Sequence, residues 1–353
     1  MTDERVVSTI RSMCDAAALA RQDKTTCTAF TKAFGRLISV SYPARADIAP
    51  LNLDASLVAA RGDQSFGYRV TLIDGASVGS SLSIDWPQQW LGPLGALSPE
   101  HAGDWPFAVD NETKSLIAFS PEKCESIVWC RDVSRLPYWA RATPFRIPLS
   151  WIAHTFGGEM IHGAGVAFGD QAVLLLGPGG AGKSTLALAA AQSGLPLLGD
   201  DFLVVSGLEA QAIYRRVKAH DETLERLAGG PSIGPILNAD APGEKRILDL
   251  DPGLLHVDPI SIGALVVPRI GVRATSTRMA APELLRRVLY PSMQGLLGGS
   301  GMTLKVLAQL ARHLPAYELE VGPDVQDNVA ALTAIAEEAR ETRSSTWAQQ
   351  DSA

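Results

Sequence analysis

The chain has 353 residues, enough for one large domain or two ordinary ones. Hydrophobic residues make up 46% and charged residues 20%, a balance that excludes general disorder. The net charge of −7 argues against a surface that attracts nucleic acid or anionic lipid as a whole. Neither an apolar signal core near the start nor an apolar run long enough for a bilayer is found. We therefore expect a cytoplasmic protein without nucleic-acid or membrane partners, whose four cysteines remain free thiols.

Residues 1–36 are predicted to form a helical N-terminal segment. Val6 and Ile10 lie on one face of the expected helix, and Phe30 and Phe34 follow at helical spacing. The glycine directly after Phe34 is the expected end of this segment.

A β-rich N-terminal domain is predicted over residues 37–148. Short β-prone runs, such as residues 68–73, are separated by turn clusters such as Asp74-Gly75. No catalytic pattern is recognisable in this part of the sequence. Five tryptophans lie here, and we expect core residues rather than a ligand platform: Trp86, Trp90, Trp105, Trp129 and Trp139.

Residues 149–341 have the pattern of an α/β domain with buried strands. Strands are expected near residues 164–168, 172–176, 202–205, 262–267 and 317–321. Helices are expected at residues 149–157, 284–297, 303–313 and 325–341, with a glycine-rich loop at 298–301. The polar tail, residues 342–353, is expected to be disordered.

The strongest functional signal is the segment 177–185, which satisfies the phosphate-loop pattern G-x-x-x-x-G-K-[ST] between a strand-like and a helix-like run. Glycines let backbone N–H groups turn toward phosphate oxygens, and the helix that follows directs its positive end at the anion. Lys183 is expected to reach the β and γ phosphates, and Ser184 to offer its hydroxyl to Mg²⁺. The predicted nucleotide-binding residues are Gly177, Gly179, Gly180, Ala181, Gly182, Lys183, Ser184 and Thr185.

Two adjacent carboxylates, Asp200 and Asp201, precede the next hydrophobic strand. If the intervening helix returns the chain to the same edge of the sheet, one carboxylate can hold Mg²⁺. The other can then accept a proton from an attacking hydroxyl. A solvated turn is the alternative, but the position just after the loop helix favours the functional interpretation. His162 lies in the strand pair that leads into the loop, where a structural and a catalytic role are equally open.

A kinase must also offset the charge of the transferring phosphoryl group. Lys218 follows the acidic pair, and Arg269 ends a predicted strand. We predict both as phosphate or substrate contacts, with ordinary surface charge as the alternative.

The histidine, loop and acidic segments together resemble the catalytic domain of HPr kinase/phosphorylase. That family has a His-Gly start, a G-x-x-G-x-G-K-S loop and an Ala-Asp-Asp segment. The spacings from His162 to Gly177 and from Lys183 to Asp200 match those of the family. The resemblance implies an ATP- and Mg²⁺-dependent serine kinase. It also implies a P-loop fold of the HPr kinase and phosphoenolpyruvate carboxykinase type.

The resemblance also implies roles for individual residues. Lys183 would bind phosphate and Ser184 would bind the metal. Asp200 would act as general base and Asp201 would support the metal or the phosphate, although the sequence leaves this division open. His162 would lie near the γ-phosphate.

Looser matches extend the resemblance over residues 136–335, toward a divergent group of HPr-kinase-like proteins. Some of that group are encoded beside lasso-peptide biosynthesis genes and phosphorylate a peptide serine. The matching segments are 136–139, 214–218, 267–270 and 314–319.

Three features depart from the family pattern. Gly199 replaces the alanine before the acidic pair, which we interpret as a minor change, and Thr185 stands where the bifunctional enzymes carry glutamate. Their Ile-Glu-Ile-Arg-Gly segment is also missing. The last two departures argue against phosphorolysis and against HPr itself as the substrate.

Three functions are compatible with these residues. The first is a kinase for a serine of a peptide or small protein, and the second is a kinase for a small metabolite. The third is a nucleotide-binding regulatory module without transfer activity. The sequence leaves open whether the protein forms a homo-oligomer.

Overall fold

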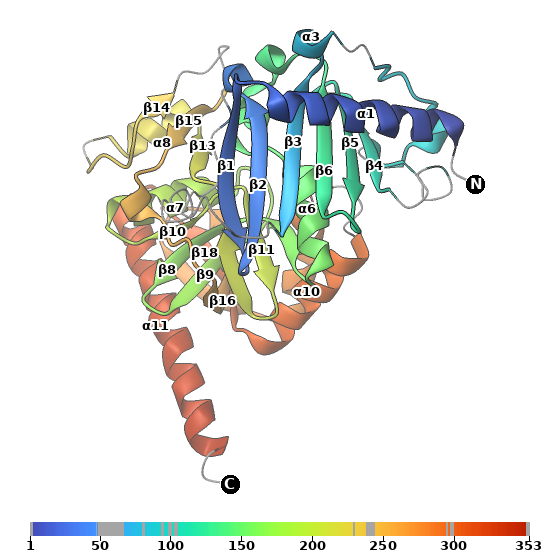
Figure 1. Ribbon diagram of the computed structural model, residues 1–353. Helices are drawn as coiled ribbons and strands as arrows, with labels where there is room; N and C mark the ends of the chain where they lie inside the picture. Colours follow the sequence, from blue (N-terminus) through green and yellow to red (C-terminus); the bar gives the residue numbers. More distant parts are fainter. Residues whose placement is uncertain are drawn as a thin grey trace. The chain divides into compact units, whose positions relative to one another are not determined.

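The computed structural model describes residues 3–46, 48, 67–79, 82–92, 95–97, 101, 105–228, 230–237, 244–293, 296 and 300–350. The chain divides into two compact units, which we call the N-terminal unit and the C-terminal unit. They comprise Met1–Gly157 with Gly295–Gly299, and Gly158–Gln294 with Ser300–Ala353. Helices and mixed sheets occur in both units, so the protein belongs to the α/β class (Figure 1).

The N-terminal unit is built on a six-stranded sheet with the order β1-β2-β3-β6-β5-β4. Its strands are β1 (Thr26–Ala33), β2 (Arg36–Pro43), β3 (Tyr68–Asp74), β4 (Phe107–Asp110), β5 (Ser115–Ser120) and β6 (Glu125–Cys130). The central strand β3 pairs in parallel with β2 and β6, whereas the outer pairs are antiparallel. The short helices are η1 (Ala44–Ala46), α3 (Gly75–Val78), η2 (Gln88–Trp90), η4 (Val133–Arg135) and α5 (Tyr138–Ala142).

Helix α1 (Glu4–Gln22) lies across one face of this sheet (Figure 1). The Asp3 side chain caps it by accepting a hydrogen bond from the Arg5 N–H at 2.8 Å. Val6 and Met13 are fully buried against a core that contains Trp86 and Trp129. Trp90 and Trp105 pack at the edge of the same core. These four tryptophans are therefore packing residues, as the sequence predicts.

The helix predicted over residues 1–36 is wrong beyond Gln22, because residues 26–43 form the hairpin of β1 and β2. The turn consists of Phe34 and Gly35, with φ of 46° and 75°. Two successive residues with positive φ are typical of a two-residue hairpin turn. The glycine interpreted as a helix stop is therefore the turn of a hairpin.

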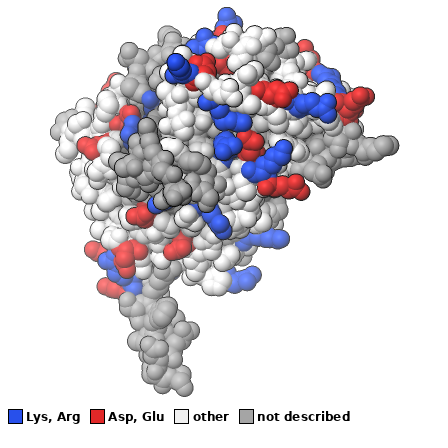
Figure 2. Space-filling view, viewed as in Figure 1, with Lys and Arg blue, Asp and Glu red and all other residues white. Residues whose placement is uncertain are grey.

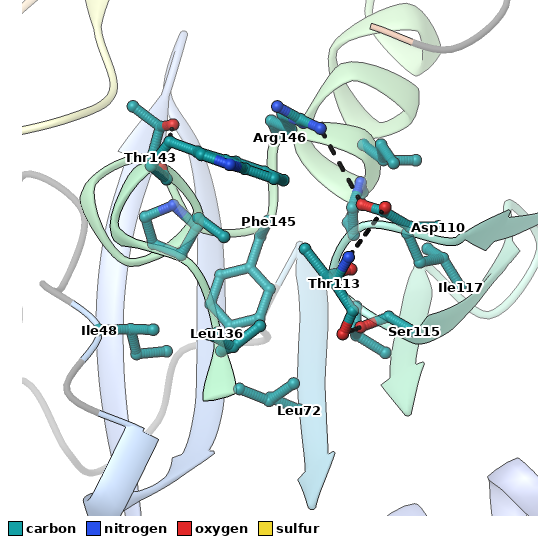
Figure 3. Close-up of a pocket in the computed structure, with 16 residues that line it drawn as sticks. Ile48, Leu72, Asp110, Thr113, Ser115, Ile117, Leu136, Thr143, Phe145 and Arg146 are labelled. Atoms are coloured by element: carbon teal, nitrogen blue, oxygen red, sulfur yellow. Dashed lines mark hydrogen bonds and ion pairs between the residues drawn. The ribbon is translucent and has the colours of Figure 1, made fainter. Parts of the chain in front are cut away.

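Helix α6 (Arg146–Thr155) packs on the same sheet, where Trp151 stacks on Phe119 with ring centroids 6.2 Å apart. This helix belongs to the N-terminal unit, whereas the sequence analysis assigns it to the catalytic domain from residue 149. A pocket of about 60 Å³ lies beside its first turn (Figure 3). There the Arg146 guanidinium stacks on Trp139 at 4.2 Å and forms an ion pair with Asp110 at 3.9 Å. Trp139 thus lines a small pocket.

The C-terminal unit is built on a nine-stranded mixed sheet whose main path is β10-β8-β9-β16-β12-β11-β7, with β18 pairing β16 and β17 pairing β18. The strands are β7 (Glu159–His162), β8 (Ala164–Phe168), β9 (Gln171–Leu175), β10 (Leu197–Gly199), β11 (Phe202–Ser206), β12 (Glu209–Ala212), β16 (Ile260–Ile270), β17 (Thr275–Met279) and β18 (Ala316–Val321). The three strands β9, β16 and β18 are parallel. They include the strands predicted at 172–176, 262–267 and 317–321.

Helices cover both faces of this sheet. Val173 and Leu175 of β9 point into the core with α7 (Lys183–Gln192) and α11 (Val325–Gln350). Leu174 and Leu176 point into the opposite core with α9 (Ala281–Ser292) and α10 (Ser300–His313). Because both faces are buried, these strands read as continuous apolar runs in the sequence.

A small third sheet, β13-β15-β14, packs against the α7 side of the large sheet. Its strands are β13 (Arg216–Ala219), β14 (Ile236–Leu237) and β15 (Arg246–Asp249), with α8 (Asp221–Arg226) and η5 (Pro252–Leu254) nearby in the chain. The sequence analysis misses this sheet.

Helix α11 continues to Gln350. The prediction that this helix ends at residue 341 and is followed by a disordered tail from 342 is therefore wrong up to residue 350. Residues 351–353, and 297–299 of the predicted glycine-rich loop, lie outside the described residues. No helix in the described part of the chain combines the length and apolar character needed to cross a bilayer. On the face shown in Figure 2, the described acidic and basic side chains are interspersed.

Candidate functional site

The phosphate-loop segment joins β9 to α7 in the C-terminal unit. Gly182 caps α7 with a φ of 98°, a conformation that favours glycine. The Lys183 side chain is buried, and its Nζ donates to the carbonyl oxygens of Gly177 and Pro178 at 2.8 and 2.9 Å. Burial lowers the pKa of Lys183, and the nearby Asp200 and Asp201 oppose this shift. The lysine is thus held inside its own loop, beside the helix N-terminus.

The acidic pair occupies a strained turn between β10 and β11. Gly199 has a φ of 120°, and Asp201 has a φ of 71°, which is uncommon for a residue with a side chain. Two backbone bonds hold the turn: Phe202 N–H donates to the Asp200 carbonyl at 3.0 Å, and Gly163 N–H donates to the Asp201 carbonyl at 2.9 Å. Non-glycine residues in this conformation cluster at functional sites, because surrounding structure must enforce them.

Asp201 is paired with two cationic or polar side chains from other strands. Lys218 of β13 forms an ion pair with its carboxylate, and the Nε2 of His162 lies 3.8 Å from Oδ1. Burial by itself would raise the pKa of Asp201, but the nearby Lys218 and His162 outweigh it. The pKa of Asp201 is therefore held well below its usual range, and this carboxylate stays ionised.

Asp200 has the opposite environment. Its side chain is 1% exposed, and Oδ2 has no hydrogen-bond partner among the described residues. Burial, and then the charge of Asp201, raise its pKa, while the Ser184 hydroxyl works in the other direction. Two adjacent carboxylates thus differ in proton affinity, with Asp200 as the group that takes up a proton more readily.

A cavity of about 390 Å³ brings these groups together. Its lining includes most of the residues predicted from sequence, from the phosphate loop, the acidic turn, β7 and β13: His162, Gly179, Gly180, Gly182, Lys183, Ser184, Thr185, Asp200, Asp201 and Lys218. Gly177 and Ala181 belong to the same loop but are not in this lining. The acidic pair and the phosphate loop therefore lie at one site, as a joint role of the two requires.

His162 has two contacts, and both bear on its open role. Its Nδ1 lies 3.1 Å from the carbonyl oxygen of Pro291 in α9, while Nε2 faces Asp201. The ring therefore links α9 to the acidic turn. This geometry suits a residue that orients Asp201, and it also exposes the ring to the cavity.

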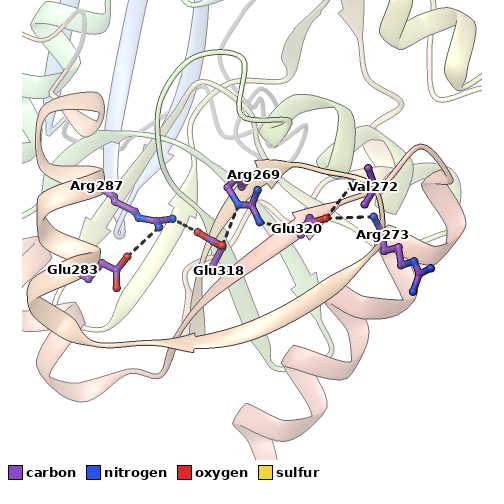
Figure 4. A network of polar contacts seen from close by, with 7 residues as sticks. All are labelled: Arg269, Val272, Arg273, Glu283, Arg287, Glu318 and Glu320. Carbon is purple, nitrogen blue, oxygen red and sulfur yellow. Dashed lines mark hydrogen bonds and ion pairs between the residues drawn. The ribbon is translucent and has the colours of Figure 1, made fainter.

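Arg269 lies outside this cavity, in a neighbouring hollow of about 430 Å³ formed with Pro178–Ala181. It is half exposed, and its guanidinium is paired with Glu318 at 3.1 Å and Glu320 at 2.5 Å (Figure 4). Glu318 also pairs with Arg287 in the same network. The Arg269 guanidinium is already paired with two carboxylates of β18. Arg269 therefore ties β16 to β18 beside the loop.

Several cavity residues were not found from the sequence. Lys245 precedes β15 and Arg226 ends α8, and both line the cavity. Thr223 also lines it and hydrogen-bonds the Thr185 hydroxyl at 3.0 Å. The pairing of β15 with β13 brings Lys245 to the same cavity as Lys218. Each of these strands has four residues, which is too short for a hydrophobic pattern to predict the pairing.

A scan with protein-family models finds no match for this chain, and a search of curated proteins finds no significant match either. The function must therefore be inferred from the site itself.

The turn at Gly199 provides a first prediction. Gly199→Ala places a side chain at a φ of 120° and a Cβ 3.3 Å from the Tyr214 carbonyl oxygen. We expect the free energy of unfolding to fall by about 1–3 kcal/mol. Alanine at this position is thus not the minor change that the sequence suggests. Urea unfolding tests this, with Gly253→Ala as control, since its added Cβ meets Asp251 at an ordinary 3.4 Å. Equal stability of the two variants would contradict it.

The environment of Asp200 provides a second prediction. Because its folded pKa lies above the ordinary value of 3.8, the folded state binds this proton more tightly than the unfolded chain. Ionisation of Asp200 therefore destabilises the fold as pH rises above about 4. Asp200→Asn should increase the free energy of unfolding at pH 7, and this gain should vanish near pH 3. Urea unfolding across that range measures it, and a gain that is independent of pH would refute the assignment.

Proposed function

We propose that this protein is a nucleoside-triphosphate-dependent kinase that phosphorylates a hydroxyl group, namely a serine of a peptide or small protein. One observation carries the proposal: the phosphate loop and the unequal acidic pair line a single cavity. A phosphate-binding loop accounts for a triphosphate, and a buried carboxylate with raised proton affinity accounts for a base. Neither feature alone would define the reaction.

In the proposed reaction, Lys183 and the loop amides hold the β and γ phosphates. Asp200 accepts the proton of the attacking hydroxyl, because burial raises the pKa of Asp200. The hydroxyl oxygen bonds the γ-phosphorus as the bond from that phosphorus to the β–γ bridging oxygen breaks, and the nucleoside diphosphate leaves. Lys218 and Lys245, both in the cavity lining, offset negative charge on the transferring group. Asp201, held ionised by Lys218, and His162 keep the turn and its charge in place.

The donor set also fits Mg²⁺. Of the described residues, no group of three or more His, Cys, Asp or Glu is placed to hold a metal by itself. Magnesium needs fewer protein ligands, since it binds through one or two carboxylates together with substrate phosphates and water. The Ser184 hydroxyl and the Asp201 carboxylate would hold it here. When bound, Mg²⁺ supplies charge neutralisation between the phosphates.

The proposed family is that of HPr kinase, with the phosphoenolpyruvate carboxykinase type of fold. The support is the order of the elements: His162 on β7, the loop after β9, and the acidic turn before β11 in one mixed sheet. ATP is the donor and a peptide serine the acceptor that this family implies. Thr185, which bonds Thr223 rather than presenting a carboxylate, is consistent with a kinase that does not run the reverse reaction.

Incubation with γ-labelled ATP, Mg²⁺ and a panel of serine peptides, small proteins and free metabolites tests the proposal. Label on a peptide or protein acceptor is the expected result. Label only on free serine or a sugar would favour a metabolite kinase. Nucleotide binding with no labelled acceptor across the panel would favour a regulatory module, and absence of nucleotide binding would overturn the proposal.

A further inference from the structure

We propose that the pocket between the first turns of α7 and the β18–α11 connection holds the base and ribose of the nucleotide. This inference rests on the proposed function, because it assumes that the loop binds the phosphates. The pocket has a volume of about 130 Å³. Its lining includes Leu186 of α7, Ile270 at the end of β16, and Val321, Val325 and Asn328 of the β18–α11 region.

The pocket is continuous with the phosphate cavity. Both share Gly182, Thr185, Arg226 and Ile270 in their linings. The acidic turn lines the phosphate cavity and is absent from the lining of this pocket. Because the γ-phosphate must face the acidic turn, the α-phosphate and the sugar must leave the loop away from it. The pocket therefore begins where the proposed phosphate chain ends.

Its chemistry suits a flat ring more than a phosphate. Leu186, Val321 and Val325 make the walls apolar, and no acidic side chain is among the lining residues. Ile270 is 58% exposed at the rim, although it is a large aliphatic residue. A base seated in the pocket would cover this side chain and remove apolar surface from water.

One wall of the pocket is fixed by a two-point contact. The Gly322 N–H donates to Asn328 Oδ1 at 2.8 Å, and Asn328 Nδ2 donates to the Gly322 carbonyl at 2.9 Å. Arg226 also lines the pocket; it is exposed and forms no ion pair within the described residues. A planar guanidinium at that position can stack on a base or meet the α-phosphate.

The hollow beside Arg269 is the competing place for a base. It touches Pro178–Ala181, at the start of the loop, and its two arginines are engaged with Glu318, Glu320 and Glu283 (Figure 4). The pocket beside α7 instead touches the end of the loop and the helix that follows. The base of a bound nucleotide follows the sugar away from the phosphates and favours an apolar surface. The apolar lining of the pocket beside α7 therefore favours this pocket over the hollow beside Arg269.

Calorimetric titration of the full chain with MgATP and with magnesium tripolyphosphate separates base binding from phosphate binding. We expect wild-type protein to bind ATP more tightly than tripolyphosphate. Val325→Ala should weaken ATP binding about 5–10-fold and leave tripolyphosphate binding within about twofold. Val325 lines this pocket but neither the phosphate cavity nor the hollow beside Arg269. The matched control is Val272→Ala, because Val272 is 79% exposed and lines none of these three spaces. It should change neither affinity.

Four outcomes overturn the inference. Equal weakening of both ligands by Val325→Ala would place Val325 at the phosphates rather than at the base. Unchanged ATP affinity would mean that the base lies elsewhere, for example beside Arg269. Wild-type protein that binds neither ligand would overturn the proposed function together with the base pocket, whereas tripolyphosphate binding equal to that of ATP would overturn the base pocket alone.

Discussion

Asp200→Asn is expected to lower the rate of phosphoryl transfer by about 10²–10⁴-fold, the usual contribution of a positioned general base. Asparagine keeps the size of the side chain but cannot accept the proton of an attacking hydroxyl. Nucleotide affinity should change little, because Lys183 and the loop amides, rather than Asp200, are expected to grip the phosphates. Single-turnover kinetics with labelled ATP, combined with calorimetry, measure the two quantities separately.

Asp170→Asn is the matched control, since Asp170 is an exposed carboxylate of the same unit that pairs with Arg340 at 3.2 Å. It should leave both quantities unchanged. Retention of full transfer activity by Asp200→Asn would exclude this residue as the base and shift the role to Asp201. If Asp200→Asn preserves the cellular role while Lys183→Ala abolishes it, nucleotide binding without transfer is the better account.

Lys183→Ala is expected to weaken ATP binding strongly and to lower transfer by at least about 10²–10³-fold. The lysine places a charge inside the loop, in a site where burial lowers its pKa and strengthens its interaction with an anion. Its removal also leaves the Gly177 and Pro178 carbonyls without the donor that they have in this structure.

Calorimetric titration with MgATP and thermal unfolding should therefore be measured together. Lys305→Ala, at an exposed position on α10, is the control for loss of a positive charge. ATP affinity of a folded Lys183→Ala variant equal to that of the control would contradict a phosphate-binding role for the loop.

The N-terminal residues show where sequence patterns mislead. Phe30 and Phe34 have helical spacing, yet β1 alternates between sheet faces and ends in the turn at Phe34 and Gly35. A glycine after an apolar run is compatible with a helix end and with a hairpin turn. The pairing partner, β2, decides between them, and local periodicity does not contain that information.

The strand, the loop and the helix at residues 171–192 could be predicted from sequence because each depends on neighbouring residues. Apolar β9 needs burial on both faces, the glycines permit positive φ, and the alanine-rich run favours α7. The two adjacent carboxylates, Asp200 and Asp201, can likewise be read directly from the sequence. Local chemistry therefore determines which reactive groups the chain has.

Which of these groups work together is decided by tertiary structure. Lys218 meets Asp201 only because β13 packs beside α7. The two carboxylates differ because Lys218 and His162 reach Asp201, whereas burial and the charge of Asp201 raise the pKa of Asp200. Arg269 pairs with Glu318 and Glu320 on the adjacent parallel strand, outside the cavity, whereas Lys218 pairs with Asp201 inside it. Proton affinity and charge pairing depend on distances between strands that are remote in sequence, so no local pattern can specify them.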